Sequence, residues 1–125
     1  MTAPNTAVWF EIPVADLARA VRFYETVFTV TLRQEGCPDG MPMAIFPADP
    51  AAVTGCLIQH EHCKPSADGS TVYLNGGDDL SAPLARAVEA GATLVVPKTL
   101  IAPEIGYFAQ FIDSEGNRVG LHSLH

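Results

Sequence analysis

Positive charge and cysteine are both scarce in this sequence of 125 residues. It has 7 Lys and Arg against 14 Asp and Glu, which gives a formal net charge of −7. Such an acidic chain is not drawn to nucleic acid phosphates or to an anionic membrane surface, so we expect neither partner. The 3 cysteines are too few and too irregularly spaced for a disulfide framework. Their small number indicates a reduced, cytoplasmic protein.

Long apolar runs and a secretion signal are also missing. No stretch approaches the roughly 20 apolar residues that a membrane-spanning helix needs. The opening segment "MTAPNTAVWF" lacks the basic start and long apolar stretch of a signal peptide. Hydrophobic residues are nevertheless abundant, at 48% of the sequence. We therefore expect one folded domain over residues 1–125, with a modest continuous core.

The sequence contains two copies of one unit. "WFEIPVADLARAV", which begins at Trp9, and "VYLNGGDDLSAPL", which begins at Val72, each read as strand, turn, Asp-Leu pair and helix. Asp16 and Asp79 are suited to cap these helices, because a carboxylate accepts hydrogen bonds from the free amides of a first turn. Apolar residues at helical spacing follow the first cap: Leu17, Ala20, Val21, Tyr24, Val27 and Phe28.

Three strands are predicted after each helix. We expect them at about 27–34, 41–46 and 53–60, and again at about 92–97, 106–112 and 118–124. Gly91 is expected to end the second helix. The polar, turn-rich segment 62–70 is long enough to join the halves. The domain is therefore predicted to consist of two modules, about 7–61 and 70–125.

Strand alternation predicts which side chains face away from the helices. A sheet with one helix on its back buries that face, and successive side chains point to opposite faces. We therefore expect five residues on the other face: Trp9, Glu11, Tyr73, Asn75 and His122. If this face curls into a trough, they converge there as ligand-binding residues. The alternative for His122 is a partly exposed position near the end of a frayed last strand.

The segments "IPVADLARAVRFYETVF" and "DSEGNRVGLHS" resemble the vicinal oxygen chelate superfamily. This group includes glyoxalase I, extradiol dioxygenases, and bleomycin and fosfomycin resistance proteins. The resemblance covers nearly the whole chain. It implies an α+β fold of two βαβββ modules, which form a half-open mixed β-sheet barrel with the helices outside. It also implies completion of the barrel by homodimerisation.

The resemblance further indicates where metal ligands would lie, and this sequence lacks them. Trp9 stands where the first-strand histidine is expected, and Val72 or Tyr73 stands in place of the second. Gly120 replaces the last-strand glutamate, and residues 55–57 offer no carboxylate. A divalent cation needs several converging oxygen or nitrogen donors. We therefore expect no metal at the usual site and no other cofactor.

Other groups of potential ligands need a separate interpretation. A divalent metal at a displaced site, built from Glu11, His122 and Gln59, is an alternative that the residues leave open. "HEHC", His60 to Cys63, has no second cluster at zinc spacing and is read as a solvated strand end. Cys37 has no cationic neighbour that would lower a thiol pKa, so we expect an inert turn cysteine.

Three hypotheses for function follow from these residues. The first is a glyoxalase- or bleomycin-resistance-like protein that binds a small organic molecule in its trough, with Trp9 and Tyr73 stacking on it. The second is a metal-dependent or metal-independent lyase, isomerase or dioxygenase-type enzyme in which Glu11 and His122 act as base and acid. In the third, Glu11, Asn75 and His122 form a purely structural hydrogen-bond network.

Overall fold

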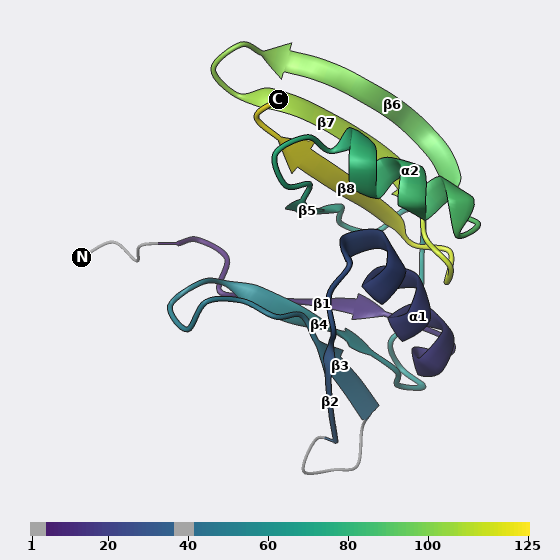
Figure 1. The fold of residues 1–125 in the computed structure, drawn as a ribbon. Coiled ribbons are helices and arrows are strands. Elements are labelled where there is room, and N and C mark those ends of the chain that lie inside the picture. The colour runs from purple at the N-terminus through teal and green to yellow at the C-terminus, as the bar shows by residue number, and fades with distance from the viewer. Residues whose placement is uncertain (1–4, 37–41) are drawn as a thin grey trace.

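The first half of the chain forms a four-stranded sheet covered by one helix (Figure 1). The structure is a computed structural model and describes residues 5–36 and 42–125. The elements of this half, called module 1, are β1 (Trp9–Pro13), α1 (Leu17–Phe28), β2 (Arg33–Gly36), β3 (Pro42–Ile45) and β4 (Thr54–Ile58). The strand order is β1-β4-β3-β2, with β1 parallel to β4 and the other neighbours antiparallel.

The second half, called module 2, repeats this arrangement. Its elements are β5 (Val72–Asn75), α2 (Ser81–Glu89), β6 (Thr93–Ala102), β7 (Gly106–Ile112) and β8 (Arg118–Ser123). The strand order β5-β8-β7-β6 has the same directions as in module 1. In the described residues the two sheets stay separate and do not close into one barrel. The predicted α+β fold, with two half-open βαβββ units, is confirmed.

Helix α1 runs from Leu17 to Phe28, the same limits as the apolar helical spacing in the sequence. Asp16 has extended backbone angles, and its Oδ1 accepts a hydrogen bond from Arg19 N at 3.1 Å. The prediction of a strand from residue 27 is wrong, because the helix continues to Phe28 and β2 begins only at Arg33. The chain turns at Thr29, which has φ 51° and donates its N–H to the carbonyl of Glu25.

Helix α2 uses a different pair of end contacts. The helix starts at Ser81, and its N-cap residue is Leu80. The predicted Asp79 lies one residue before the N-cap, and its Oδ1 still accepts from Ser81 N at 2.9 Å. At the other end Gly91 has φ 105°. Gly91 N donates to Val88 O at 3.0 Å, and Ala92 N donates to Ala87 O at 2.9 Å. These two bonds form a Schellman motif, so the prediction that Gly91 ends the helix is confirmed.

Strand β6 is longer than predicted. It runs to Ala102 rather than stopping near Pro97. Proline lacks the N–H that a central strand needs, but β6 lies at the edge of its sheet, where that loss is tolerated. Its pairing with β7 shifts register between Leu94 and Val96, and again between Val96 and Thr99, the interval that contains Pro97.

One hydrophobic core spans both modules. Its largest fully buried side chains include Tyr24, Leu57, Leu80, Phe111 and Leu121. The rings of Phe23 and Phe111 lie 5.9 Å apart across the module boundary. The helices lie side by side in Figure 1, and Arg86 Nε of α2 donates to Val27 O at 2.7 Å. Neither helix in the described residues is long and apolar enough to cross a membrane.

Candidate functional site

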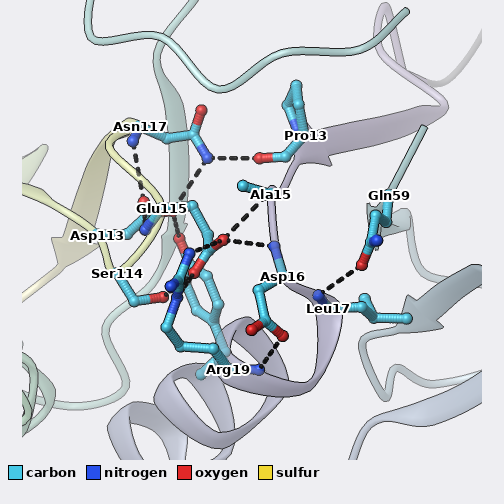
Figure 2. Close-up of polar contacts among 11 residues, drawn as sticks. Pro13, Ala15, Asp16, Leu17, Arg19, Gln59, Asp113, Ser114, Glu115 and Asn117 are labelled. Atoms are coloured by element: carbon cyan, nitrogen blue, oxygen red, sulfur yellow. Dashed lines mark hydrogen bonds and ion pairs between the residues drawn. The ribbon is translucent and has the colours of Figure 1, made fainter. Parts of the chain in front are cut away.

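The turn between β7 and β8, residues 113–117, crosses to the start of α1 in module 1 (Figure 2). Asn117 Nδ2 donates to Pro13 O at 2.7 Å. Glu115 Oε1 accepts from the backbone N–H groups of Ala15 and Asp16, both at 2.9 Å. The Asp-Ser-Glu-Gly-Asn motif is therefore more than a turn, because its side chains fasten the two modules together.

A buried carboxylate organises this turn from inside. Asp113 Oδ2 accepts from the Tyr24 hydroxyl at 2.6 Å, and its Oδ1 accepts from the N–H groups of Glu115 and Asn117 at 2.9 Å. Burial raises the pKa of Tyr24 well above its ordinary value of 10.0, and the charge of Asp113 and the hydrogen bond to it act in the same direction. Tyr24 is thus a neutral hydrogen-bond donor with a structural role.

Glu115 completes the connection as an ion pair with Arg19. The Nε–Oε2 distance is 2.7 Å, and the Glu115 side chain is completely covered while that of Arg19 is 48% exposed. Burial alone would raise the pKa of Glu115. Hydrogen bonds from Arg19, from the Asp16 and Ala15 N–H groups and from Ser114 outweigh burial and lower that pKa to about 2. A carboxylate held ionised in this way is unsuited to general acid–base catalysis near neutral pH.

The same strand-to-helix junction in each module is also held from within its own sheet. In module 1, Leu17 N donates to Gln59 Oε1 at 2.8 Å. In module 2, Leu80 N donates to Ser123 Oγ at 2.9 Å. Gln59, a candidate ligand for a displaced metal, therefore has its side-chain carbonyl engaged at the start of α1, as Figure 2 shows.

The predicted site residues lie on the helix-free face, meaning the face of each sheet turned away from α1 and α2. In β1, Ile12 is buried in the core and Phe10 packs against it, while Trp9 and Glu11 are exposed. In β5, Leu74 is buried, while Tyr73 and Asn75 are exposed. His122 alternates with the buried Leu121 in β8 and is partly buried.

A hollow of about 380 Å³ lies on the helix-free face of module 2. This face hollow is lined by Tyr73, Ile101, Phe108 and His122. The Tyr73 ring lies over Gly120, where an added Cβ would collide with it, and meets Phe108 edge to face with ring centroids 6.3 Å apart. The structure therefore brings Tyr73 and His122 together.

A larger hollow of about 640 Å³ lies between the modules. This inter-module hollow has Phe10, Phe28 and Phe46 on its module 1 side, and Tyr73 and Asn75 on its module 2 side. Tyr73 thus lines both hollows.

Two of the predicted residues lie elsewhere. Trp9 and Glu11 line neither the face hollow nor the inter-module hollow. Both belong to β1 of the first sheet, whereas Tyr73 and His122 belong to the second. The structure therefore does not bring all five predicted residues to one hollow.

Sequence reasoning missed a polar chain beside Tyr73. Gln110 Nε2 lies 2.6 Å from the Tyr73 hydroxyl, and Arg118 Nη1 lies 3.2 Å from Gln110 Oε1. Arg118 Nε also donates to Ala67 O at 3.2 Å. Gln110 is directly opposite Gly120 in the β7–β8 pairing. The one sequence feature that could have indicated this chain is Gly120. A glycine within a strand leaves room for another side chain to lie across it, here the Tyr73 ring.

The proposed polar network of Glu11, Asn75 and His122 is not seen. His122 Nε2 lies 2.7 Å from Ile105 O, and Asn75 Oδ1 accepts from Gly77 N at 2.8 Å. Within residues 5–36 and 42–125, no hydrogen bond joins Glu11, Asn75 and His122 to one another. Each polar group is instead held locally or faces solvent.

The residues at the superfamily's metal positions do not fit a divalent cation. At Gly120 the Tyr73 ring occupies the space of a side chain, and at Gly55 an added Cβ would collide with Phe10. In the part of the chain that the structure describes, no group of three or more His, Cys, Asp or Glu is placed to hold a metal. His60 Nδ1 accepts from His62 N at 3.1 Å. Cys37 lies outside the described residues.

Comparisons with known proteins agree with this architecture. The family model "Bleomycin resistance protein-like N-terminal" matches residues 6–37. No curated protein sequence matches the chain. Among solved structures, TnmS3, an antibiotic binding protein from Streptomyces sp. CB03234, is 24% identical with a TM-score of 0.63, over 98% of both chains.

Two further solved structures match over nearly the full length. A glyoxylase/bleomycin resistance protein/dioxygenase domain from Frankia sp. EAN1pec is 15% identical with a TM-score of 0.68, over 97% of this chain and 98% of that one. The fosfomycin resistance protein FosX from Listeria monocytogenes is 13% identical with a TM-score of 0.66, over 98% and 94%. The chain has the fold of the vicinal oxygen chelate superfamily, as its sequence motifs predicted.

Proposed function

We propose that this protein binds a small organic molecule against Tyr73 and does so without the superfamily's usual metal. The observation that carries the proposal is the place of Tyr73, whose ring lines both the face hollow and the inter-module hollow. A half-exposed aromatic ring fixed over a glycine offers apolar area with little loss of side-chain freedom on binding.

The walls around Tyr73 support a planar ligand with apolar faces. Phe108 and Ile101 border the face hollow, and three phenylalanines border the inter-module hollow. Mostly apolar walls with a few polar groups are typical of pockets that bind small molecules. TnmS3 is described as an antibiotic binding protein and FosX as a fosfomycin resistance protein, so the fold is compatible with small-molecule recognition.

The binding hypothesis is favoured over the enzyme that uses Glu11 and His122. A general base and a general acid must both reach the reacting atoms. Glu11 is on β1 of the first sheet and His122 on β8 of the second, and only His122 lines a described hollow. Glu11 and His122 share neither of the two described hollows, which supports a binding role for the chain over the enzymatic one.

We further propose that the protein acts as a homodimer in the cytoplasm. Large apolar side chains are exposed on the helix-free faces, including Trp9 at 44%, Tyr73 at 46% and Ile101 at 46%. Exposed apolar groups of this kind are typical of association surfaces. Light scattering coupled to size-exclusion chromatography tests the proposal, which predicts about twice the mass of the 13.3 kDa chain.

A ligand screen with paired glycine variants tests the binding function. We expect ligand-observed NMR with a library of aromatic fragments to give hits for the wild type. Gly120→Ala should abolish them, because the new Cβ displaces the Tyr73 ring. Gly69→Ala is the matched control, since an added Cβ there meets nothing within 4 Å.

A second variant separates loss of binding from loss of fold. Tyr73→Ala removes the ring at an exposed position and should lose the same hits without loss of fold. A screen without wild-type hits, or hits that survive both Gly120→Ala and Tyr73→Ala, would contradict the proposal.

A further inference from the structure

The hydrogen-bond chain from Arg118 through Gln110 reaches the face hollow at Tyr73 and fixes which way its polar groups point. The guanidinium of Arg118 can only donate, so the atom of Gln110 that faces it at 3.2 Å must be the carbonyl oxygen. The amide nitrogen of Gln110 then faces Tyr73 at 2.6 Å, and an NH₂ group also can only donate. The Tyr73 hydroxyl oxygen is therefore an acceptor inside this chain.

The hydroxyl proton of Tyr73 is left to point outward. No acceptor for it is found among the described residues, and the side chain is half exposed. A hydroxyl that accepts one hydrogen bond from a cation-supported amide is a better donor in turn, because successive hydrogen bonds polarise one another. Tyr73 thus offers a directed donor to whatever occupies the hollow.

His122 offers the opposite polarity at the same hollow. The backbone carbonyl of Ile105 can only accept, so the His122 Nε2 that lies 2.7 Å from it carries a hydrogen. In a neutral imidazole the other ring nitrogen, Nδ1, is then an acceptor. No partner for Nδ1 occurs in the described part of the chain.

From these polarities we infer that the face hollow recognises a planar ring that carries both a hydrogen-bond acceptor, met by Tyr73, and a hydrogen-bond donor, met by His122. A lactam or a hydroxylated ring ketone has this pattern. Phe108 and Ile101 provide the apolar walls for the ring. The inference rests on the proposed function and narrows it to a class of ligand and to one of the two hollows.

Four ring compounds separate the two polar contacts. Quinolin-2(1H)-one has a donor and an acceptor on one edge, N-methylquinolin-2-one keeps only the acceptor, indole keeps only a donor, and N-methylindole has neither. Affinities are measured by NMR titration at pH 8. Each matched hydrogen bond should improve the wild-type Kd roughly five- to tenfold within a pair.

Gln110→Glu reverses the polarity of Tyr73 and gives the sharpest test. The new carboxylate accepts from both Arg118 and the Tyr73 hydroxyl, so the tyrosine proton turns inward. N-methylquinolin-2-one should then bind roughly five- to tenfold more weakly, while indole keeps its affinity. Tyr73→Phe should act in the same direction. Gln34→Glu, the same change at an exposed position of β2, is the matched control and should alter neither ligand.

The outcomes separate this inference from the proposed function. If all four compounds bind the wild type but their ranking is the same in Gln110→Glu, the polarity assignment is wrong and binding at Tyr73 still stands. If no compound binds the wild type, both are overturned. A ranking that shifts equally in Gln34→Glu would trace the effect to added charge and would also overturn the inference.

Discussion

The two modules have one architecture and differ at two equivalent places. The β7–β8 turn of module 2 docks on the β1–α1 junction through Asp113, Glu115 and Asn117. Its counterpart in module 1, the β3–β4 turn, faces β5 across the inter-module hollow. Among the described residues, no hydrogen bond joins residues 47–53 to the β5–α2 junction. One side of the molecule is thus fastened and the other is open.

The helix-free faces differ in the same sense. In module 2 this face presents Tyr73, Gln110, Arg118 and His122. Arg118 is hydrogen-bonded to Gln110 and Gln110 to Tyr73, while His122 is hydrogen-bonded to a backbone carbonyl. In module 1 the positions opposite Glu11 and Pro13 are Cys56 and Ile58, both buried. The duplicated fold therefore has its stabilising contacts at the start of α1 and the groups of the proposed binding site on the sheet of module 2.

The largest expected effect comes from breaking the fastened side at its centre. Asp113→Ala should lower the free energy of unfolding by about 3–5 kcal/mol, because Tyr24 and two backbone N–H groups lose a buried acceptor. Urea denaturation at pH 7 measures the loss. Asp49→Ala, in the exposed β3–β4 turn, is the control and should cost far less. Equal losses would contradict the difference between the two turns.

A smaller effect is expected at the ion pair. Glu115→Gln removes a charge-assisted contact to Arg19 and should cost about 1.5–3 kcal/mol at pH 7, by urea denaturation. The folded-state pKa of Glu115 is about 2, below the ordinary value of 4.5. The stabilisation is therefore complete above about pH 5 and is lost as the pH falls toward 2.

The pH dependence gives this second prediction its own check. Between pH 5 and 2 the wild type should lose stability more steeply than Glu115→Gln, so their unfolding free energies should converge. Parallel curves over this range would show that the charge of Glu115 contributes nothing to the connection.

Substitutions at the ends of the two helices should change stability in opposite directions. Thr29 adopts φ 51° after α1, a conformation that costs a branched side chain about 1–2 kcal/mol, so Thr29→Gly should stabilise the protein by about 1 kcal/mol. Gly91 adopts φ 105° after α2, so Gly91→Ala should destabilise it by about 1 kcal/mol. Thermal unfolding monitored by circular dichroism measures both. Two changes of the same sign would refute the strain argument.

The smallest effect is expected at the exposed pair of module 2. Lys98 Nζ lies 2.9 Å from Asp79 Oδ1, and this contact, with hydrogen bonds from Ser81, lowers the pKa of Asp79 to about 2. Because Asp79 is open to solvent, Asp79→Asn should change stability less than Glu115→Gln does, and added salt should reduce the difference further. Chemical denaturation at low and high salt checks this ranking.

The duplicated fold was predictable because its signals are local. Helical spacing after Asp16 and the glycine at position 91 determine where helices lie, and strand alternation placed Tyr73 and His122 on the helix-free face. The "DSEGN" segment contributed to the family resemblance, but nothing in it indicated a contact with the first module. Its contacts with Pro13 and Tyr24 join residues about a hundred positions apart, which no local pattern reveals.

The site was only partly predictable for the same reason. The prediction that Trp9 and Glu11 lie close to Tyr73 required a particular orientation of the two sheets. That orientation depends on contacts between the modules, which the sequence does not reveal. Gln110 reaches Tyr73 because β7 and β8 pair in one particular register over Gly120. Register depends on the whole hairpin, so the polar chain from Arg118 through Gln110 to Tyr73 could not be read from residue types alone.

We propose that ligands bind on the sheet of module 2 and not at the equivalent face of module 1. The most direct test is a ¹H–¹⁵N correlation titration of the wild type with quinolin-2(1H)-one, with assigned backbone amides. We expect the largest shifts in β5 and around Phe108, Gln110 and His122, with little change in β1. Shifts centred on Trp9 and Glu11, with module 2 unaffected, would show that ligands bind at module 1 instead.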